Sequence, residues 1–336
     1  SIEKLPDETK ESVFYLRDFK KIGKQLHFKK CFPKHAFYPS NTPPNSKISL
    51  WNNFFIKNTQ DFRPRKFAHN GYTQHGEAIF KHSNEIYSEY IAHQQQYKAI
   101  LRRWDWNTKI ISKYAKTESE RFLFAERESQ VLNYIDNQEF NDEDDSLSTL
   151  HLEYIPSQSP YPESELYKYP KKLENLTNYS NTTLSTWTVD KRLNIIKVLL
   201  SNLSRLHQIG VAHRDIGAHS VWISPKSTRM QISNFIAATF PEDTNKSFIR
   251  SLRDILLHVK TPTPEDLYDD DSGTPFTRDV YLAASVVHYL AFSKWPEKKD
   301  GVFYWTLRSD DKFDGLLNNW FSKALELEPK SRFTNI

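Results

Sequence analysis

The sequence predicts an α+β fold of two lobes, a small β-rich lobe followed by a mainly helical one, behind an N-terminal extension. Segments with strand character gather in residues 86–155, around a single helical pattern. From residue 156 onward the long periodic segments are mostly helical, and residues 1–85 are broken by prolines and show little periodicity. A chain of 336 residues is long enough for both lobes and the extension.

The predicted small lobe spans about residues 86–155. Residues 97–101 and 109–114 contain β-branched and aromatic residues on either side of a turn at 105–107, so we predict a strand for each. Residues 118–135 place apolar side chains at helical spacing, which predicts the helix of this lobe. Residues 150–155 predict one more short strand.

The predicted large lobe spans about residues 156–336. Residues 156–186 are rich in Ser, Pro, Tyr and Asn, which indicates a long loop or an insertion. Residues 190–209 form a strongly amphipathic pattern that ends at Gly210, and they predict a long helix. Two more helices are expected around residues 280–292 and 316–327.

The charge distribution and the cysteine content indicate which partners and which cellular compartment to expect. Residues 1–100 carry a net charge of +7 and the remainder −3. The basic, aromatic-bearing stretch at residues 17–66 is expected to pack on the main body, with a nucleic acid or an acidic partner as the alternative. Cys31 is the one cysteine, so we expect no disulfide within the chain and an intracellular location, cytoplasmic or nuclear. No apolar run reaches membrane-spanning length, so no membrane association is expected.

The most informative segment is residues 211–223, which reads Val-Ala-His-Arg-Asp-Ile-Gly-Ala-His-Ser-Val-Trp-Ile. It follows the amphipathic helix, and a second short strand at 230–233 then leads into Asn234-Phe235-Ile236. This order resembles the catalytic loop of protein kinases, His-Arg-Asp-Leu-x-x-x-x-Asn, and the metal-binding motif Asp-Phe-Gly that follows it.

Further segments resemble kinase motifs in the same order. In the small lobe, residues 109–113 resemble the strand Val-Ala-Ile-Lys, which makes Lys113 the expected phosphate-binding lysine and Glu128 its partner on the helix. Residues 152–155 resemble the hinge between lobes, which implies that Glu153 and Ile155 border the adenine pocket.

The large lobe supplies three more landmarks. Thr263-Pro264-Glu265 resembles Ala-Pro-Glu, and Arg278-Asp279 resembles the start of a buried helix whose aspartate anchors the catalytic loop. Residues 329–333 resemble the closing motif, with Arg332 as the expected partner of Glu265. The resemblance to the eukaryotic protein kinase-like superfamily covers residues 92–336 and implies the bilobal kinase fold. It also implies structural roles for His213, Arg214, Glu265, Asp279 and Arg332.

Several positions depart from the kinase pattern. The two metal-binding positions hold Asn234 and Ser220, which offer no carboxylate and a shorter side chain. Gly217 replaces the basic residue that follows the catalytic Asp215. The expected phosphate loop, residues 91–97, contains no glycine, so its backbone cannot approach phosphates closely. We therefore expect no metal site and no tight binding of ATP or magnesium.

These departures favour a degenerate member of the family, a pseudokinase without catalytic activity. Asp215, Ser220 and Asn234 are its degenerate catalytic positions, and at most weak nucleotide binding is expected through Lys113, Glu128, Glu153 and Ile155. We expect a scaffold or allosteric subunit that binds a protein partner in a multiprotein complex. An atypical active Ser/Thr-type kinase with displaced metal ligands, and a nucleic-acid-binding adaptor that uses residues 17–66, remain alternatives.

Overall fold

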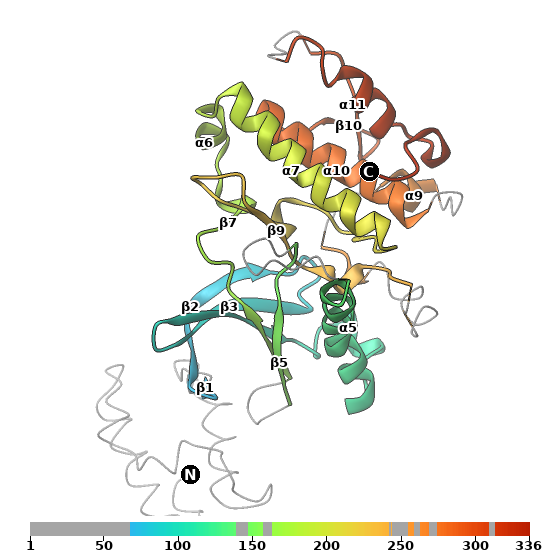
Figure 1. The fold of residues 1–336 in the computed structure, drawn as a ribbon. Coiled ribbons are helices and arrows are strands. Elements are labelled where there is room, and N and C mark those ends of the chain that lie inside the picture. Colours follow the sequence, from blue (N-terminus) through green and yellow to red (C-terminus); the bar gives the residue numbers. More distant parts are fainter. Residues whose placement is uncertain are drawn as a thin grey trace, which may run out of the picture.

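The computed structural model describes residues 68–138, 147–156, 163–241, 243, 255–258, 263–268, 274–308 and 313–336. The basic stretch at residues 17–66 lies outside these ranges. Figure 1 shows a sheet with one helix beside it in one lobe and a bundle of helices in the other. This arrangement confirms the predicted bilobal α+β fold.

The small lobe is a six-stranded antiparallel sheet in the order β1-β2-β3-β4-β6-β5. The two edges of the sheet are joined by side chains, because His69 of β1 and the adjacent Asn70 hydrogen-bond to Glu153 on β5. The strands are β1 (Ala68–His69), β2 (Tyr72–Lys81), β3 (Tyr87–Gln94), β4 (Tyr97–Trp104), β5 (His151–Ile155) and β6 (Ser164–Lys168).

The helix of the small lobe, α5 (Glu118–Asp136), packs against the sheet and against the chain that follows β9. Thr117 and Glu120 form a capping box at its N-terminus, which fixes where the helix begins. Its buried face includes two charged side chains, Arg127 and Glu128, that reach residues of the large lobe. A short 3-10 helix, η3 (Ile111–Lys113), precedes it.

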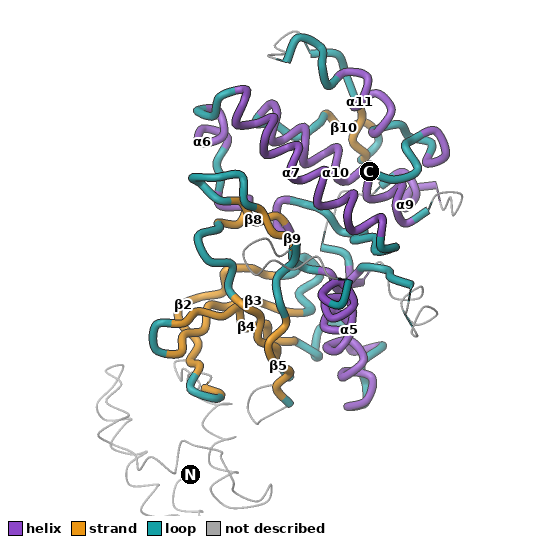
Figure 2. Tube along the Cα trace, viewed as in Figure 1, coloured by secondary structure: helices purple, strands orange, loops and turns teal. Residues whose placement is uncertain are grey.

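The large lobe is built around two long helices, α7 (Val189–Gln208) and α10 (Pro275–Phe292), which lie side by side in Figures 1 and 2. Helix α10 is buried almost all round because α7 covers one face and the C-terminal helices cover another. The other elements are β7 (Glu174–Asn175), η4 (Leu176–Asn178), α6 (Asn181–Ser185), η5 (Ala218–Ser220), β8 (Val221–Ile223), β9 (Met230–Ile232), η6 (Phe235–Ala237), α9 (Pro264–Tyr268), β10 (Glu297–Lys299), β11 (Val302–Tyr304), α11 (Asn318–Ala324) and η7 (Pro329–Ser331).

The predicted lobe boundaries were wrong at two places. The sheet begins at Ala68, so β1 and β2 lie inside the segment 1–85 that we predicted to lack regular structure. Strand β6 lies in the predicted insertion 156–186 and belongs to the sheet of the small lobe. The predicted strand at 109–114 is a turn followed by η3, because the chain has already left the sheet at Trp104.

None of the helices in the described ranges combines the length and the apolarity that crossing a membrane requires.

Candidate functional site

A buried arginine, Arg102 on β4, lies on the side of the small lobe that faces the large lobe, in the region called the cleft below. Its guanidinium donates to Glu89 Oε1 from Nε at 3.0 Å and from Nη2 at 2.8 Å, and it forms an ion pair with Glu128. It also lies against the rings of Tyr87 and Tyr167, at 4.2 and 4.7 Å from their centroids. Arg102 is 2% exposed, so charge pairing, and not solvent, stabilises this cation.

Arg102, and not Lys113, forms the ion pair with Glu128, so the expected Lys113–Glu128 pair does not form. Lys113 is exposed on η3, outside the sheet, whereas Arg102 ends the run Ala99-Ile100-Leu101-Arg102 on a central strand. The kinase motif has a lysine at this place, and this chain has an arginine. The signal was present in the sequence: three apolar residues and a cation in a strand that precedes the α5 glutamate.

The other predicted nucleotide-binding residues also lie elsewhere, because the predicted register was displaced by one strand. Glu153 is at the edge of the sheet, and His69 Nε2 lies 2.8 Å from its Oε1. Ile155 is buried in an apolar cluster with Leu101 and Leu166. Residues 152–155 are thus strand β5, and the connection between the lobes follows β6 instead. Of the four predicted residues, only Glu128 lies in the cleft.

Asn234, at the position of the metal-binding aspartate, is held by side chains of the small lobe. Its Oδ1 accepts hydrogen bonds from Arg102 Nη2 at 3.0 Å and from the Tyr87 hydroxyl at 3.3 Å. Its Nδ2 donates to the His219 carbonyl at 3.4 Å. Asn234 is 3% exposed and its oxygen is already shared by two donors, so it is poorly suited to bind a cation.

Ser220, at the second metal position, is turned into its own loop. Its hydroxyl donates to the Gly217 carbonyl at 3.0 Å and accepts from the Gly217 N–H at 3.1 Å. The residue is fully buried. Within the described residues, no three His, Cys, Asp or Glu side chains gather as a metal site. The residues present therefore do not fit the magnesium–nucleotide group that kinases hold at this place.

Asp215 lies at the catalytic position but is contacted by histidines. Its Oδ2 accepts a hydrogen bond from the His258 N–H at 2.9 Å and lies 3.3 Å from His219 Nε2. The rings of His219 and His258 are 4.4 Å apart, and Phe80 of β2 packs on both. Asp215 is 1% exposed, so its carboxylate is buried among these contacts.

The turn between β2 and β3, residues 82–86, occupies the place of the kinase phosphate loop. We had predicted that place for residues 91–97, which instead form the end of β3 and its turn into β4. The 82–86 turn contains no glycine. It is fastened to residues 255–258, because Ser83 N–H donates to His258 Nδ1 at 2.9 Å and Asn84 Nδ2 donates to the Ile255 carbonyl at 3.0 Å.

Burial changes the titration of several groups in this cleft. It lowers the pKa of His82 to about 4, against the opposing attraction of Asp215. Burial likewise lowers the pKa of His213 and raises the pKa of Glu89, although Arg102 opposes the second shift. These three shifts have the same main cause, the burial of the side chains between the lobes.

The residues with expected structural roles make the contacts that the resemblance implies. Asp279 accepts from the N–H groups of His213 and Arg214, at 2.7 and 2.6 Å, and so holds the catalytic-like loop on α10. Arg332 Nη1 donates to Glu265 Oε1 at 2.6 Å.

Comparison with solved structures agrees with this architecture. The chain is similar to crystal structures of the PknI kinase domain of Mycobacterium tuberculosis. One of these, a mutant, aligns with a TM-score of 0.51 and 16% identity over 80% of this chain and 93% of that chain. A second aligns with a TM-score of 0.51 and 16% identity over 79% and 91% of the two chains.

No family model matches the sequence, and no curated protein does. The sequence identity to the solved kinase domains is low, so the likeness concerns the fold and not the activity. The order of landmarks along the chain and the structural match together show that this chain has the bilobal fold of the protein kinase-like superfamily.

Proposed function

We propose that the chain is a pseudokinase that acts as a scaffold or allosteric subunit by binding another protein. The observation that carries this proposal is the pair of hydrogen bonds from Arg102 and Tyr87 to the Asn234 amide oxygen. In phosphoryl transfer, this position supplies a negative charge to magnesium and the equivalent of Arg102 contacts phosphate. Here the Asn234 amide and the Arg102 guanidinium hydrogen-bond to each other, and both side chains are buried.

The packing around Asp215 supports the same proposal. A catalytic aspartate must accept a proton from a substrate hydroxyl, within hydrogen-bond reach. The Asp215 carboxylate instead accepts the His258 N–H and faces His219. Residues 255–258 also lie against the 82–86 turn, so a substrate would have to displace them before it reached Asp215.

An active kinase with displaced metal ligands is the alternative that a specific observation favours. Asp279 holds His213 and Arg214 in the loop that carries Asp215, so the scaffold of a catalytic loop is intact. The acidic runs at residues 139–145 and 269–271, which could supply other metal ligands, lie outside the described residues. The nucleic-acid-binding adaptor depends on residues 17–66, also outside them, and it stays a prediction.

Calorimetric titration with ATP, with and without magnesium, tests the proposal. Each lost contact to phosphate or metal is worth about 1.5–3 kcal/mol, so two or three losses weaken binding by a few orders of magnitude. We expect no saturable binding in the micromolar range, no effect of magnesium, and no phosphate transfer. As a matched control, Lys113→Ala should bind nucleotide no differently from the native chain.

A micromolar dissociation constant that tightens with magnesium, together with ATP turnover abolished by Asp215→Ala, would favour the active kinase. The Asn234→Asp variant sharpens the test. Because the restored carboxylate would lie beside Arg102, we expect it to pair with that cation and not to recruit magnesium.

A further inference from the structure

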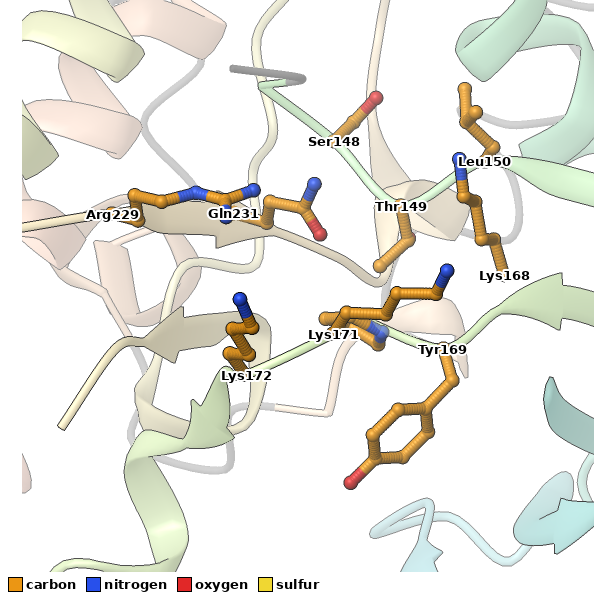
Figure 3. A pocket seen from close by; sticks show the side chains of 10 residues that line it. Ser148, Thr149, Leu150, Lys168, Tyr169, Lys171, Lys172, Arg229 and Gln231 are labelled. Atoms are coloured by element: carbon orange, nitrogen blue, oxygen red, sulfur yellow. The ribbon is translucent and has the colours of Figure 1, made fainter. Parts of the chain in front are cut away.

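A basic cavity, here called the hinge pocket, lies where the connection between the lobes passes β9. Its volume is about 280 Å³. Figure 3 shows Lys168 and Lys171 on the side of Thr149, and Lys172 on the side of Arg229 and Gln231. Ser148, Leu150, Tyr169 and Pro170 complete the lining.

Backbone hydrogen bonds fix the walls of the hinge pocket. The Lys168 N–H donates to the Leu150 carbonyl at 2.8 Å, and the Thr149 N–H donates to the Ile232 carbonyl at 3.2 Å. Three segments that are far apart in the sequence are thereby joined. The pocket is therefore largely formed before any ligand arrives, which lowers the entropic cost of binding.

The charges of the hinge pocket have one sign. Four of its ten described lining residues are cations, Lys168, Lys171, Lys172 and Arg229, and none of these ten carries a carboxylate. An anion that binds among these four cations is attracted by each of them. The hydroxyl and amide groups of Ser148, Thr149 and Gln231 add neutral hydrogen-bonding groups to the same cavity.

The backbone of Lys172 gives a second, independent indication. Lys171 and Lys172 are the central residues of a turn that the Leu173 N–H closes on the Pro170 carbonyl, at 3.3 Å. Lys172 has a φ of +61°, a conformation that favours glycine at this place in a turn. Strained backbone positions of this kind cluster at binding sites and switches, so the conformation of Lys172 is consistent with a binding role for this turn.

We propose that the hinge pocket binds a phosphorylated serine or threonine side chain of a partner protein. A phosphate monoester has a charge of about −1.5 to −2 and three acceptor oxygens, which match several ammonium groups around one small cavity. This proposal states which chemical group of a partner protein the scaffold binds, and it rests on the scaffold function proposed above. Its test measures peptide binding and not nucleotide binding, so the two can fail separately.

A nucleic acid fits this pocket less well. Binding of single strands uses aromatic rings as stacking platforms along an extended groove. The one aromatic side chain of the pocket, Tyr169, already packs edge-on with Trp222 at 5.9 Å and lies under Lys98 Nζ at 5.6 Å. A single cavity of about 280 Å³ accommodates a side chain and not a run of nucleotides.

Fluorescence anisotropy with the full chain tests the proposal. The probes are labelled random-sequence peptides with a fixed central phosphoserine or phosphothreonine, and the same peptides without phosphate. We expect binding of the phosphorylated probes that is at least about tenfold tighter, and competition by free phosphoserine. The variant Lys171→Ala/Lys172→Gly should lose this preference while remaining folded, because glycine suits the turn.

The matched control is Lys197→Ala/Lys330→Ala, which removes the same charge from exposed positions outside the pocket and should bind like the native chain. The acidic run Asp142–Asp145 precedes Ser148 closely in the sequence and could compete with the probe. The titration is therefore repeated with that run changed to amides, and phosphate-dependent binding in either background supports the site. Absence of such binding from both backgrounds, equal binding by the pocket variant, or binding of single-stranded RNA alone would overturn it.

Discussion

At the scale of single residues, the cleft is stabilised by charges that a catalytic site would leave available. Arg102 is enclosed by Glu89 and Glu128, and the three form one buried network with Asn234. Buried ion pairs add little net stability, because desolvation offsets their attraction. The removal of one member is nevertheless costly, since it leaves the others charged and unpaired.

Replacement of Arg102 tests this network. We expect Arg102→Ala to lower the free energy of unfolding by about 3–5 kcal/mol, because Glu89 and Glu128 lose their buried partner. Arg102→Lys should lower the free energy of unfolding by less, since lysine keeps the positive charge but lacks the planar guanidinium group. Lys113→Ala, at an exposed position, should change stability by less than about 0.5 kcal/mol. Urea denaturation measures all three, and equal effects at 102 and 113 would contradict the assignment of Arg102.

His82 predicts a pH dependence of stability. Its pKa is about 4 in the folded chain against an ordinary value of 6.5, so the unfolded chain binds the extra proton more readily. The contribution of His82 is complete above pH 6.5 and is lost as the pH falls toward 4. Between pH 7.5 and pH 5 this amounts to about 2 kcal/mol. Denaturation at the two pH values should show a smaller difference in His82→Gln, and an unchanged difference would speak against a buried neutral histidine.

At the scale of elements, residues 255–258 cover the cleft by contacts that reach both lobes. They accept hydrogen bonds from the 82–86 turn, and the His258 N–H donates to Asp215. Leu256 is fully buried in the cluster that contains Ile86 and Trp104. The turn and the short segment therefore hold each other in place.

This mutual contact is measurable by hydrogen exchange. The Ser83 N–H donates to His258 Nδ1, so His258→Ala removes its acceptor. We expect exchange in residues 82–86 to accelerate several-fold, up to about tenfold, with little change elsewhere. His75→Ala, an exposed histidine on β2, is the control and should leave these amides protected. Unchanged exchange in His258→Ala would show that the turn is stable without this segment.

The elements also show why some features were predictable and others were not. The large-lobe landmarks are short contiguous motifs, so His213, Asp279 and Arg332 could be located from the sequence. The small lobe depends on strand register, and an arginine in place of the expected lysine displaced that register onto Lys113. The bond from Tyr87 to Asn234 joins residues far apart in the chain, and no local pattern encodes it.

At the scale of the whole molecule, the two lobes are connected through α5. Glu128 accepts the Phe235 N–H at 2.7 Å, and Arg127 donates to the Ile236 carbonyl at 3.0 Å and to Asp243 at 3.1 Å. The chain after Ile236 is in turn tied to the large lobe by the bridge between Ala212 and Thr239. In an active kinase this helix moves relative to the large lobe, whereas here buried charges fasten it.

Arg127 therefore determines whether the lobes unfold together. We expect the native chain to show one cooperative thermal transition, because loss of the small lobe would expose the carbonyl and carboxylate groups that Arg127 pairs. Arg127→Ala removes the ion pair with Asp243 and the hydrogen bonds to the Ile236 and Ala238 carbonyls, which costs about 3–5 kcal/mol and falls on the connection between the lobes. We expect its calorimetric trace to separate into two transitions, with the small lobe unfolding first. Arg121→Ala is the matched control. Arg121 lies on the same helix, and within the described residues its ion pair and hydrogen bonds go to Glu163 and to the carbonyls of Ala115 and Lys116, all in the small lobe. It should lower the transition temperature slightly and keep a single transition. A single transition in Arg127→Ala, displaced no further than in the control, would show that α5 does not couple the lobes.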